Sequence, residues 1–155
     1  LLDGHDMGLM SEAGLPAIAD PGSDVVKAAH QLGITVRAMV GPSSLLLALM
    51  SSGMNGQSFA FHGYLPIERP NRIRKIENLE KDVQIKGQTQ IFMETPYRNN
   101  GLLEDLLQTC HPDSLLSISC EVKGQDGFSK TKKIQDWKKQ LPDLHKKPTI
   151  FLLGR

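Results

Sequence analysis

Two loops rich in small residues contain the groups best suited to bind a small charged ligand. Residues 9–22 read LMSEAGLPAIADPG and residues 40–44 read VGPSS. Each loop joins an expected strand to an expected helix, and open α/β sheets bind ligands at that edge. Glycine lets a ligand approach the main chain closely, and the free amides of a helix N-terminus favour a carboxylate or phosphate. Either loop alone is commonly an ordinary turn, but together they predict one ligand crevice.

A second polar cluster, residues 94–100 (ETPYRNN), follows an expected apolar strand. Its carboxylate (Glu94) and guanidinium (Arg98) could orient a substrate or work as acid-base groups. The alternative is a structural Glu94–Arg98 ion pair, with Asn99 capping the next helix. Lys123 lies after the following expected strand, where it too could face a substrate. These residues are therefore candidates for chemistry or for structure.

Several classes of protein are excluded by what the sequence lacks. Neither small-residue loop has the glycine spacing of a nucleotide triphosphate or dinucleotide site, and no G-x-S-x-G elbow is present. The five histidines and the two cysteines have no metal-ligand spacing, so we predict no metal site and no disulfide. No apolar run approaches the length of a membrane span, which predicts a cytoplasmic protein.

The order of expected elements predicts an α/β fold in two parts. The first part has a strand (7–11), a helix (23–31), a second strand (35–40) and a buried apolar helix (45–50), with parallel strand pairing. Residues 51–58 have the composition of a linker. We therefore expect residues 1–57 to end one parallel-sheet domain and residues 58–155 to form a complete α/β domain with a mixed sheet. The elements predicted in the second part are strands at 59–63, 90–94, 115–120, 128–131 and 149–153, and helices at 69–81, 99–109 and 134–140.

The ends and the charges of the chain add two expectations. The chain opens with Leu1 and soon reaches a strand that should be central, so we expect upstream residues to be missing. Residues 1–57 carry two basic and five acidic side chains, whereas residues 58–155 carry sixteen basic and twelve acidic ones. The basic excess of the second part would suit an anionic partner such as RNA, although lysine-rich surfaces are more often simply solvated.

Five segments together resemble one family. They are SEAGLPAIADPG, VGPSSLLLAL, FAFHGYLP, IFMETPYRNN and the closing PTIFLLG. In this order they resemble the tetrapyrrole methylase superfamily, the class III methyltransferases that use S-adenosyl-L-methionine. The branch most similar in sequence contains the ribosomal RNA small-subunit (cytidine 2′-O)-methyltransferases.

The resemblance implies a fold and a set of cofactor residues. Family members have two α/β domains with S-adenosyl-L-methionine folded between them, and form homodimers. A glycine-rich cofactor loop would lie upstream of residue 1, so we expect this chain to be inactive alone. The positions that match the family's cofactor contacts are Glu12, Gly14, Leu15, Pro42, Ser43, Ser44, Met93, Cys120 and Thr149.

The implied activity is methyl transfer, with either a ribosomal RNA ribose 2′-hydroxyl or a tetrapyrrole or corrin as acceptor. A hydroxyl acceptor needs a base, for which Glu94 and Lys123 are the candidates, with Arg98 beside them. Two other functions stay open. One is a noncatalytic RNA-binding module that uses the basic second part, and the other is a phosphate-binding hydrolytic α/β protein that uses the helix start at Ser43 and Ser44.

Overall fold

The computed structural model describes residues 3–155, and the chain divides into two compact units between Ser43 and Ser44. Within the described residues, no helix is long and apolar enough to cross a membrane.

The N-terminal unit contains one helix, α1 (Ser23–Gln31), at the position that the sequence predicts. The helix follows Gly22, whose φ of 135° is a conformation that side-chain-bearing residues rarely adopt. A Cβ at Gly22 would also lie 2.7 Å from Leu9 Cδ2, so the Leu9 side chain would have to move for any other residue. The helix ends where the Leu32 N–H donates to the carbonyls of Ala28 and Ala29.

The strands predicted at 7–11 and 35–40 are wrong for this structure, because neither segment forms a strand. All of their side chains except that of Ser11 are exposed, including Met10 (90%) and Met39 (85%), although the first segment is expected to be a central strand. A strand needs a neighbour to pair its N–H and C=O groups, and no pairing partner for either segment lies within residues 3–155. Apolar patterning alone therefore does not make these segments strands.

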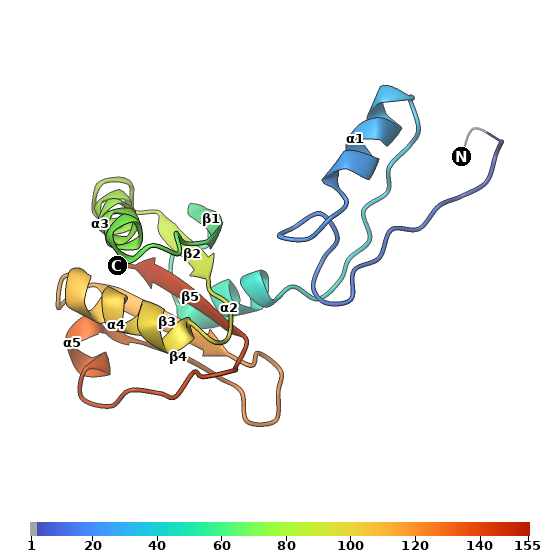
Figure 1. Ribbon diagram of the computed structural model, residues 1–155. Helices are drawn as coiled ribbons and strands as arrows, with labels where there is room; N and C mark the ends of the chain where they lie inside the picture. The colour runs from blue at the N-terminus through green and yellow to red at the C-terminus, as the bar shows by residue number, and fades with distance from the viewer. Residues whose placement is uncertain (1–2) are drawn as a thin grey trace. The chain divides into compact units, whose positions relative to one another are not determined.

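The C-terminal unit is built on a five-stranded mixed sheet, which confirms the predicted α/β class with a mixed sheet (Figure 1). The strand order is β1-β2-β5-β3-β4; β1 and β2 are parallel, and every other neighbouring pair is antiparallel. The strands are β1 (Phe59–Tyr64), β2 (Thr89–Met93), β3 (Leu115–Cys120), β4 (Phe128–Lys133) and β5 (Thr149–Gly154). The helices are α2 (Ser44–Ser52), α3 (Arg69–Lys86), α4 (Asn99–Thr109) and α5 (Ile134–Trp137).

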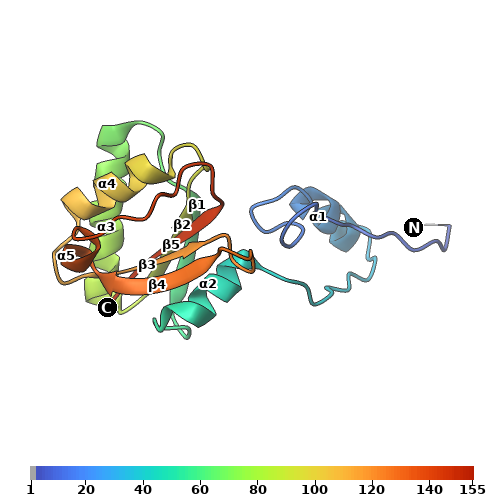
Figure 2. The same ribbon diagram turned by 90° about the horizontal axis from the view of Figure 1, so that it is seen from below.

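The sheet carries a separate apolar core on each face, because successive side chains of a strand point to opposite sides. Phe151 and Leu153 of β5 belong to the larger core under α3, α4 and α5, whereas Ile150 and Leu152 pack toward α2 (Figure 2). Trp137 of α5 is buried and donates its indole N–H to the Leu116 carbonyl at 2.8 Å. This contact anchors α5 to the sheet.

Most predicted elements of residues 58–155 match the structure, with shifted ends. The helix predicted at 69–81 continues to Lys86 and ends at Gly87, which adopts a left-handed φ of 61°. The helix predicted at 134–140 is only the short α5. Residues 44–52 form α2, whose Ala48 and Leu49 are buried as predicted for this segment, although Leu46 and Met50 are exposed. Since α2 packs on the sheet, the compact C-terminal unit starts at Ser44, before residue 57. The domain boundary at residue 57 stays a prediction.

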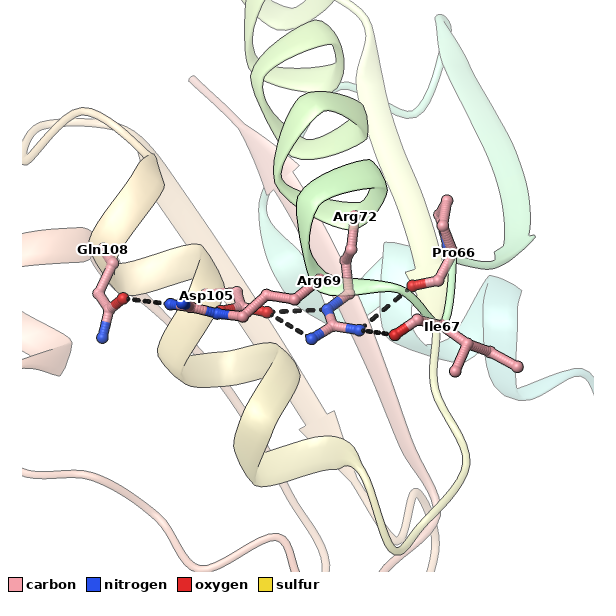
Figure 3. A network of polar contacts seen from close by, with 6 residues as sticks. All are labelled: Pro66, Ile67, Arg69, Arg72, Asp105 and Gln108. Atoms are coloured by element: carbon pink, nitrogen blue, oxygen red, sulfur yellow. Dashed lines mark hydrogen bonds and ion pairs between the residues drawn. The ribbon is translucent and has the colours of Figure 1, made fainter.

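A buried carboxylate joins α3 to α4. Asp105 of α4 is 2% exposed and accepts from Arg69 Nε and Arg72 Nε, both at 2.8 Å (Figure 3). Arg72 also donates to the carbonyls of Pro66 and Ile67. The Arg72 side chain is 12% exposed and that of Arg69 is 58% exposed, so the two ion pairs differ in their contact with water.

We expect Asp105→Ala to lower the free energy of unfolding by about 3 kcal/mol or more, since it leaves two guanidinium groups without their partner. Arg72→Ala should cost nearly as much, because it leaves the buried carboxylate short of a cation. Arg69→Ala should cost about 1 kcal/mol or less, as expected for an exposed pair. Urea unfolding of the three variants measures this order, and equal losses for Arg69→Ala and Arg72→Ala would contradict it.

Candidate functional site

The described C-terminal unit contains a pocket of about 330 Å³ where β3 ends and β5 begins. Antiparallel pairing puts Cys120, the last residue of β3, opposite Thr149, the first residue of β5. The pocket therefore lies at one end of the two central strands. Its lining residues are Ser44, Ser119, Glu121, Val122, Gly124, Pro148, Thr149 and Ile150.

A tight turn, residues 121–127, forms one side of this pocket. The Glu121 N–H donates to the Pro148 carbonyl at 2.8 Å, and the Gly124 N–H donates to the Glu121 carbonyl at 2.6 Å. A Cβ at Gly127 would collide with the Glu121 carbonyl oxygen, so only glycine fits the return of the turn. Glu121 and Lys123 both have positive φ, at 48° and 72°. The turn is held by its own backbone and presents Glu121, Val122 and Gly124 to the pocket.

The lining combines apolar surface with a few polar groups, as ligand pockets commonly do. Val122, Pro148 and Ile150 supply the apolar part. Two of the three hydroxyls are already engaged, because Ser119 Oγ accepts from Ser129 Oγ and Thr149 Oγ1 donates to the Lys147 carbonyl. Glu121 adds a carboxylate. The pocket therefore offers an apolar surface beside one carboxylate, an arrangement that can hold an apolar ring carrying hydrogen-bond donors.

Of the predicted cofactor positions in this unit, two line the pocket and two lie behind it. Ser44 and Thr149 are lining residues. The Cys120 side chain is buried in the larger core. Met93 pairs with Ile150 in the sheet register and packs against the smaller core. These two residues can support the lining strands, but they are not among the residues that line the pocket.

The remaining predicted cofactor positions, Glu12, Gly14, Leu15, Pro42 and Ser43, all lie in the N-terminal unit. Gly14 has a left-handed φ of 74°. The two predicted loops meet within this unit, since a Cβ at Gly41 would lie 2.9 Å from Leu15 Cδ2. That approach fits the expectation that both loops border one crevice.

The residues predicted to be catalytic, Glu94, Arg98 and Lys123, lie in two separate parts of the C-terminal unit. Glu94 is 5% exposed, and its Oε1 accepts from Arg98 Nη2 and from the Thr95 N–H, both at 2.7 Å. The ion pair that the sequence left as an alternative is therefore present. Lys123 is exposed in the turn 121–127, between two pocket-lining residues.

The expected cap on α4 is wrong. The N-cap position is Arg98, no side chain caps the helix, and Asn99 is the first helical residue. The Asn99 side chain turns inward and donates to the Lys147 carbonyl at 2.7 Å. Its partner carbonyls lie more than forty residues away along the chain, so local sequence patterns could not indicate this contact.

The predicted site residues do not include six of the lining residues. They are Ser119, Glu121, Val122, Gly124, Pro148 and Ile150. Glu121 had a usable signal, since it is an acid directly after a buried strand. Pro148 had none, because its place depends on the pairing of β5 with β3. Among residues 3–155, no group of three or more His, Cys, Asp or Glu side chains could hold a metal ion.

Burial keeps both cysteines protonated. Burial, and then the neighbouring Glu80 carboxylate, raise the pKa of the Cys110 thiol to about 12. Burial also raises the pKa of the Cys120 thiol, against a smaller lowering by its hydrogen bond with Thr149. Both thiols are free, and they behave as core side chains.

No family model matches the chain. Curated relatives do. The chain is 38% identical over 113 residues to "Ribosomal RNA small subunit methyltransferase I" of Streptococcus pyogenes serotype M3, which is 73% of this chain and 38% of that protein. The protein of the same name from Vibrio cholerae is 37% identical over 107 residues, 69% of this chain and 36% of that protein. The Buchnera aphidicola protein of that name is 29% identical over 99% of this chain and 53% of its own length. The chain thus spans about one third to one half of these relatives.

Solved structures agree on the fold. The methyltransferase CobJ has a TM-score of 0.58 at 18% identity and covers 92% of this chain, which covers 62% of CobJ. Cobalt precorrin-4 methyltransferase, CbiF, has a TM-score of 0.59 at 12% identity, with 91% of this chain and 61% of that chain covered. Uroporphyrin-III C-methyl transferase from Thermus thermophilus, complexed with S-adenyl homocysteine, has a TM-score of 0.52 at 16% identity, with 92% and 63% covered.

The fold is that of the tetrapyrrole methylases. The sequence matches are to proteins named ribosomal RNA small subunit methyltransferase I, which fits the ribosomal RNA branch of that superfamily. This agrees with the resemblance carried by the five sequence segments.

The raised pKa of Cys110 predicts how stability depends on pH. In the unfolded chain the thiol titrates near its ordinary pKa of 9.0, whereas folded Cys110 stays protonated up to about 12. The stabilisation from the neutral thiol is therefore complete below about pH 9 and is lost as the pH rises toward 12. Between these values the thiol lowers the free energy of unfolding by about 1.4 kcal/mol per pH unit. Urea unfolding at pH 8 and pH 10, compared with the Cys110→Ala variant, tests this, and an identical pH slope in the variant would contradict it.

Proposed function

We propose that the chain is part of an S-adenosyl-L-methionine-dependent class III methyltransferase, with either a ribosomal RNA ribose 2′-hydroxyl or a tetrapyrrole or corrin as methyl acceptor. The single observation that carries the proposal is the 36–38% identity to proteins named as ribosomal RNA methyltransferases. The pocket of the C-terminal unit supports it, because an apolar surface beside the Glu121 carboxylate suits an adenosine, whose ribose hydroxyls can donate hydrogen bonds. The neighbour with bound S-adenyl homocysteine supports the same ligand class.

The pocket residues would hold the nucleoside part of the cofactor. In this proposal the Glu121 carboxylate accepts hydrogen bonds from the ribose hydroxyls, and Val122, Pro148 and Ile150 provide apolar contact for the adenine. Ser44 adds a hydroxyl at the start of α2. Glu12, Gly14, Leu15, Pro42 and Ser43 remain proposed contacts for the amino acid part of the cofactor.

The cofactor itself supplies a methyl group on a sulfonium, which is already a strong electrophile. The protein's task is therefore to orient the two reactants and to exclude water. Lys123 stands exposed beside the pocket-lining Val122 and suits an anionic acceptor, whether its charge comes from phosphates or from carboxylates. Glu94 and Arg98 stay candidates for acid-base chemistry, but their mutual ion pair and the Thr95 hydrogen bond favour a role in holding residues 94–98. We also propose a homodimer, as the resemblance implies, and a cytoplasmic location, as the apolar patterning predicts.

Binding of S-adenosylhomocysteine to the 155-residue chain tests the cofactor proposal. We expect isothermal titration calorimetry to detect binding, and Glu121→Gln to weaken it about tenfold, since a hydrogen bond to a charged group contributes about 1.5–3 kcal/mol. Glu104→Gln is the matched control, because Glu104 is an exposed glutamate on α4 that does not line the pocket. Equal affinities in both variants would remove Glu121 from the site.

The acceptor is identified separately, by transfer of tritium from labelled S-adenosyl-L-methionine to bulk RNA or to a corrinoid precursor. The assay uses the full-length protein that contains this chain. Label in RNA supports the ribosomal RNA acceptor, and label in the corrinoid supports the tetrapyrrole acceptor. RNA binding that weakens with salt and ignores the cofactor, without any transfer, would favour a noncatalytic RNA-binding module.

A further inference from the structure

The first residue of α4 has a side chain that reaches across to the segment leading into the pocket. Asn99 is completely buried, and its Nδ2 donates to the Lys147 carbonyl at 2.7 Å and to the Leu144 carbonyl at 3.5 Å. Residues 143–148, which we call the β5 lead, run directly into Thr149 and Ile150 of the pocket. Asn99 therefore contacts the chain just before the pocket wall begins.

The Lys147 carbonyl is shared between this asparagine and the pocket. It accepts from Asn99 Nδ2 and also from Thr149 Oγ1, at 3.0 Å. The next carbonyl, that of Pro148, accepts from the Glu121 N–H. Two successive carbonyls of the β5 lead thus connect Asn99 on one side with Thr149 and Glu121 on the other.

Neighbouring contacts hold the rest of the β5 lead against residues 96–100. The Lys146 N–H donates to the Pro96 carbonyl at 3.0 Å, and the Leu144 N–H donates to Asn100 Oδ1 at 2.9 Å. Lys146 and Asn100 are exposed, whereas Asn99 is buried. Because a buried polar bond is shielded from competing water, Asn99 is the contact that fixes the distance between α4 and the β5 lead.

The orientation of the Asn99 amide follows from its partners. Its Nδ2 faces two carbonyl oxygens, and an oxygen in that place would meet them with repulsion. Its Oδ1 is buried and has no hydrogen-bond partner among the described residues. Asn99 therefore leaves its buried Oδ1 without a hydrogen bond while its Nδ2 holds two carbonyls. An unsatisfied buried acceptor costs stability, so stability alone does not explain an asparagine at this position.

We propose that Asn99 is a positioning residue for the nucleoside pocket, acting through the Lys147 and Pro148 carbonyls on Thr149 and Glu121. This inference rests on the proposed function for the identity of the ligand. In this proposal Asn99 does not contact the ligand. It holds the β5 lead, and through it the lining residues Pro148 and Thr149, in position.

The test compares Asn99→Asp and Asn99→Leu with two controls in the 155-residue chain. The aspartate variant keeps the size and reverses the polarity at one atom, and the leucine variant removes both donors. Asn71→Asp makes the same chemical change at an exposed position on α3. Arg72→Ala destabilises the α3–α4 contact without touching the pocket.

The first measurement is amide hydrogen exchange by NMR, which needs no ligand. In both Asn99 variants we expect faster exchange, by about tenfold or more, at the Glu121 and Lys146 amides, with the Ile118 and Phe151 amides unchanged relative to the unmodified chain. Arg72→Ala should instead speed exchange at Ile118 and Phe151 without a particular effect at Glu121 and Lys146. Unchanged protection at Glu121 and Lys146 would overturn the proposal. Equal loss across β3 and β5, or a failure of Asn99→Leu to fold, would make Asn99 a general stability residue and would also overturn it.

The second measurement is the Kd of S-adenosylhomocysteine. We expect it to rise about tenfold in both Asn99 variants and by less than about twofold in Asn71→Asp and Arg72→Ala. Affinity within about twofold of the unmodified chain in the Asn99 variants would overturn the proposal. If the unmodified chain binds no S-adenosylhomocysteine, the proposed cofactor site fails for this chain, while the exchange data still decide the role of Asn99.

A pH series separates a hydrogen-bond role from a packing role. In Asn99→Asp, the protonated carboxyl group can donate one hydrogen bond to the Lys147 carbonyl, so this variant should regain protection at Glu121 as the pH falls from about 8 to about 5. Asn99→Leu should not. The leucine variant keeps every titratable group around this position, so their own titration cancels in the comparison; these groups are Glu94, Arg98, Asp143, His145, Lys146 and Lys147. Equal pH responses in the two variants would overturn the hydrogen-bond role.

Discussion

The C-terminal unit depends on the insertion of its last strand, β5, between β2 and β3. All six residues of Thr149–Gly154 are buried, and they pair antiparallel on both sides. Phe151 and Leu153 fill one core while Ile150 and Leu152 fill the other. A slip of one residue in register would exchange these two sets, so the alternation of the strand fixes its register. Because β5 is central, both cores and both neighbouring strands are completed only when residues 149–154 are in place.

That constraint also fixes where a ligand can bind. The pocket lies where β5 begins, and its walls are the residues just before and after this start together with the turn that follows β3. The start of β5 is in turn set by the β5 lead, whose carbonyls receive Asn99 and the Glu121 N–H. The pairing of β5 with β3 therefore orients the strand residues that line the pocket. A few hydrogen bonds outside the sheet fix where the β5 lead enters the strand.

The sequence predicts the elements of this unit well and their partners poorly. The apolar run 149–153 indicates a strand because burial on both faces leaves no polar alternation, and the run 115–120 indicates one because serines alternate with apolar residues. The segments 7–11 and 35–40 are also largely apolar, yet neither pairs with a strand in the described residues. Whether a strand forms depends on a neighbour that can lie far away in sequence. The pocket shows the same limit. The family resemblance predicts Thr149 as a site residue, whereas Glu121 and Pro148 come together only because β3 and β5 are adjacent in the sheet.

The buried polar residues of α4 show how orientation and stability are divided. Asp105 receives two arginines from α3, and Asn99 reaches the β5 lead from the start of the same helix. The apolar residues Leu102 and Leu106 would hold α4 on the sheet in several similar positions, because apolar contact is not directional. Hydrogen bonds to Asp105 and from Asn99 are directional, so together they select one position along the helix axis. The helix α4 is thus held by α3 at Asp105 and by the β5 lead at Asn99, two contacts that lie on opposite sides of Leu102 in sequence.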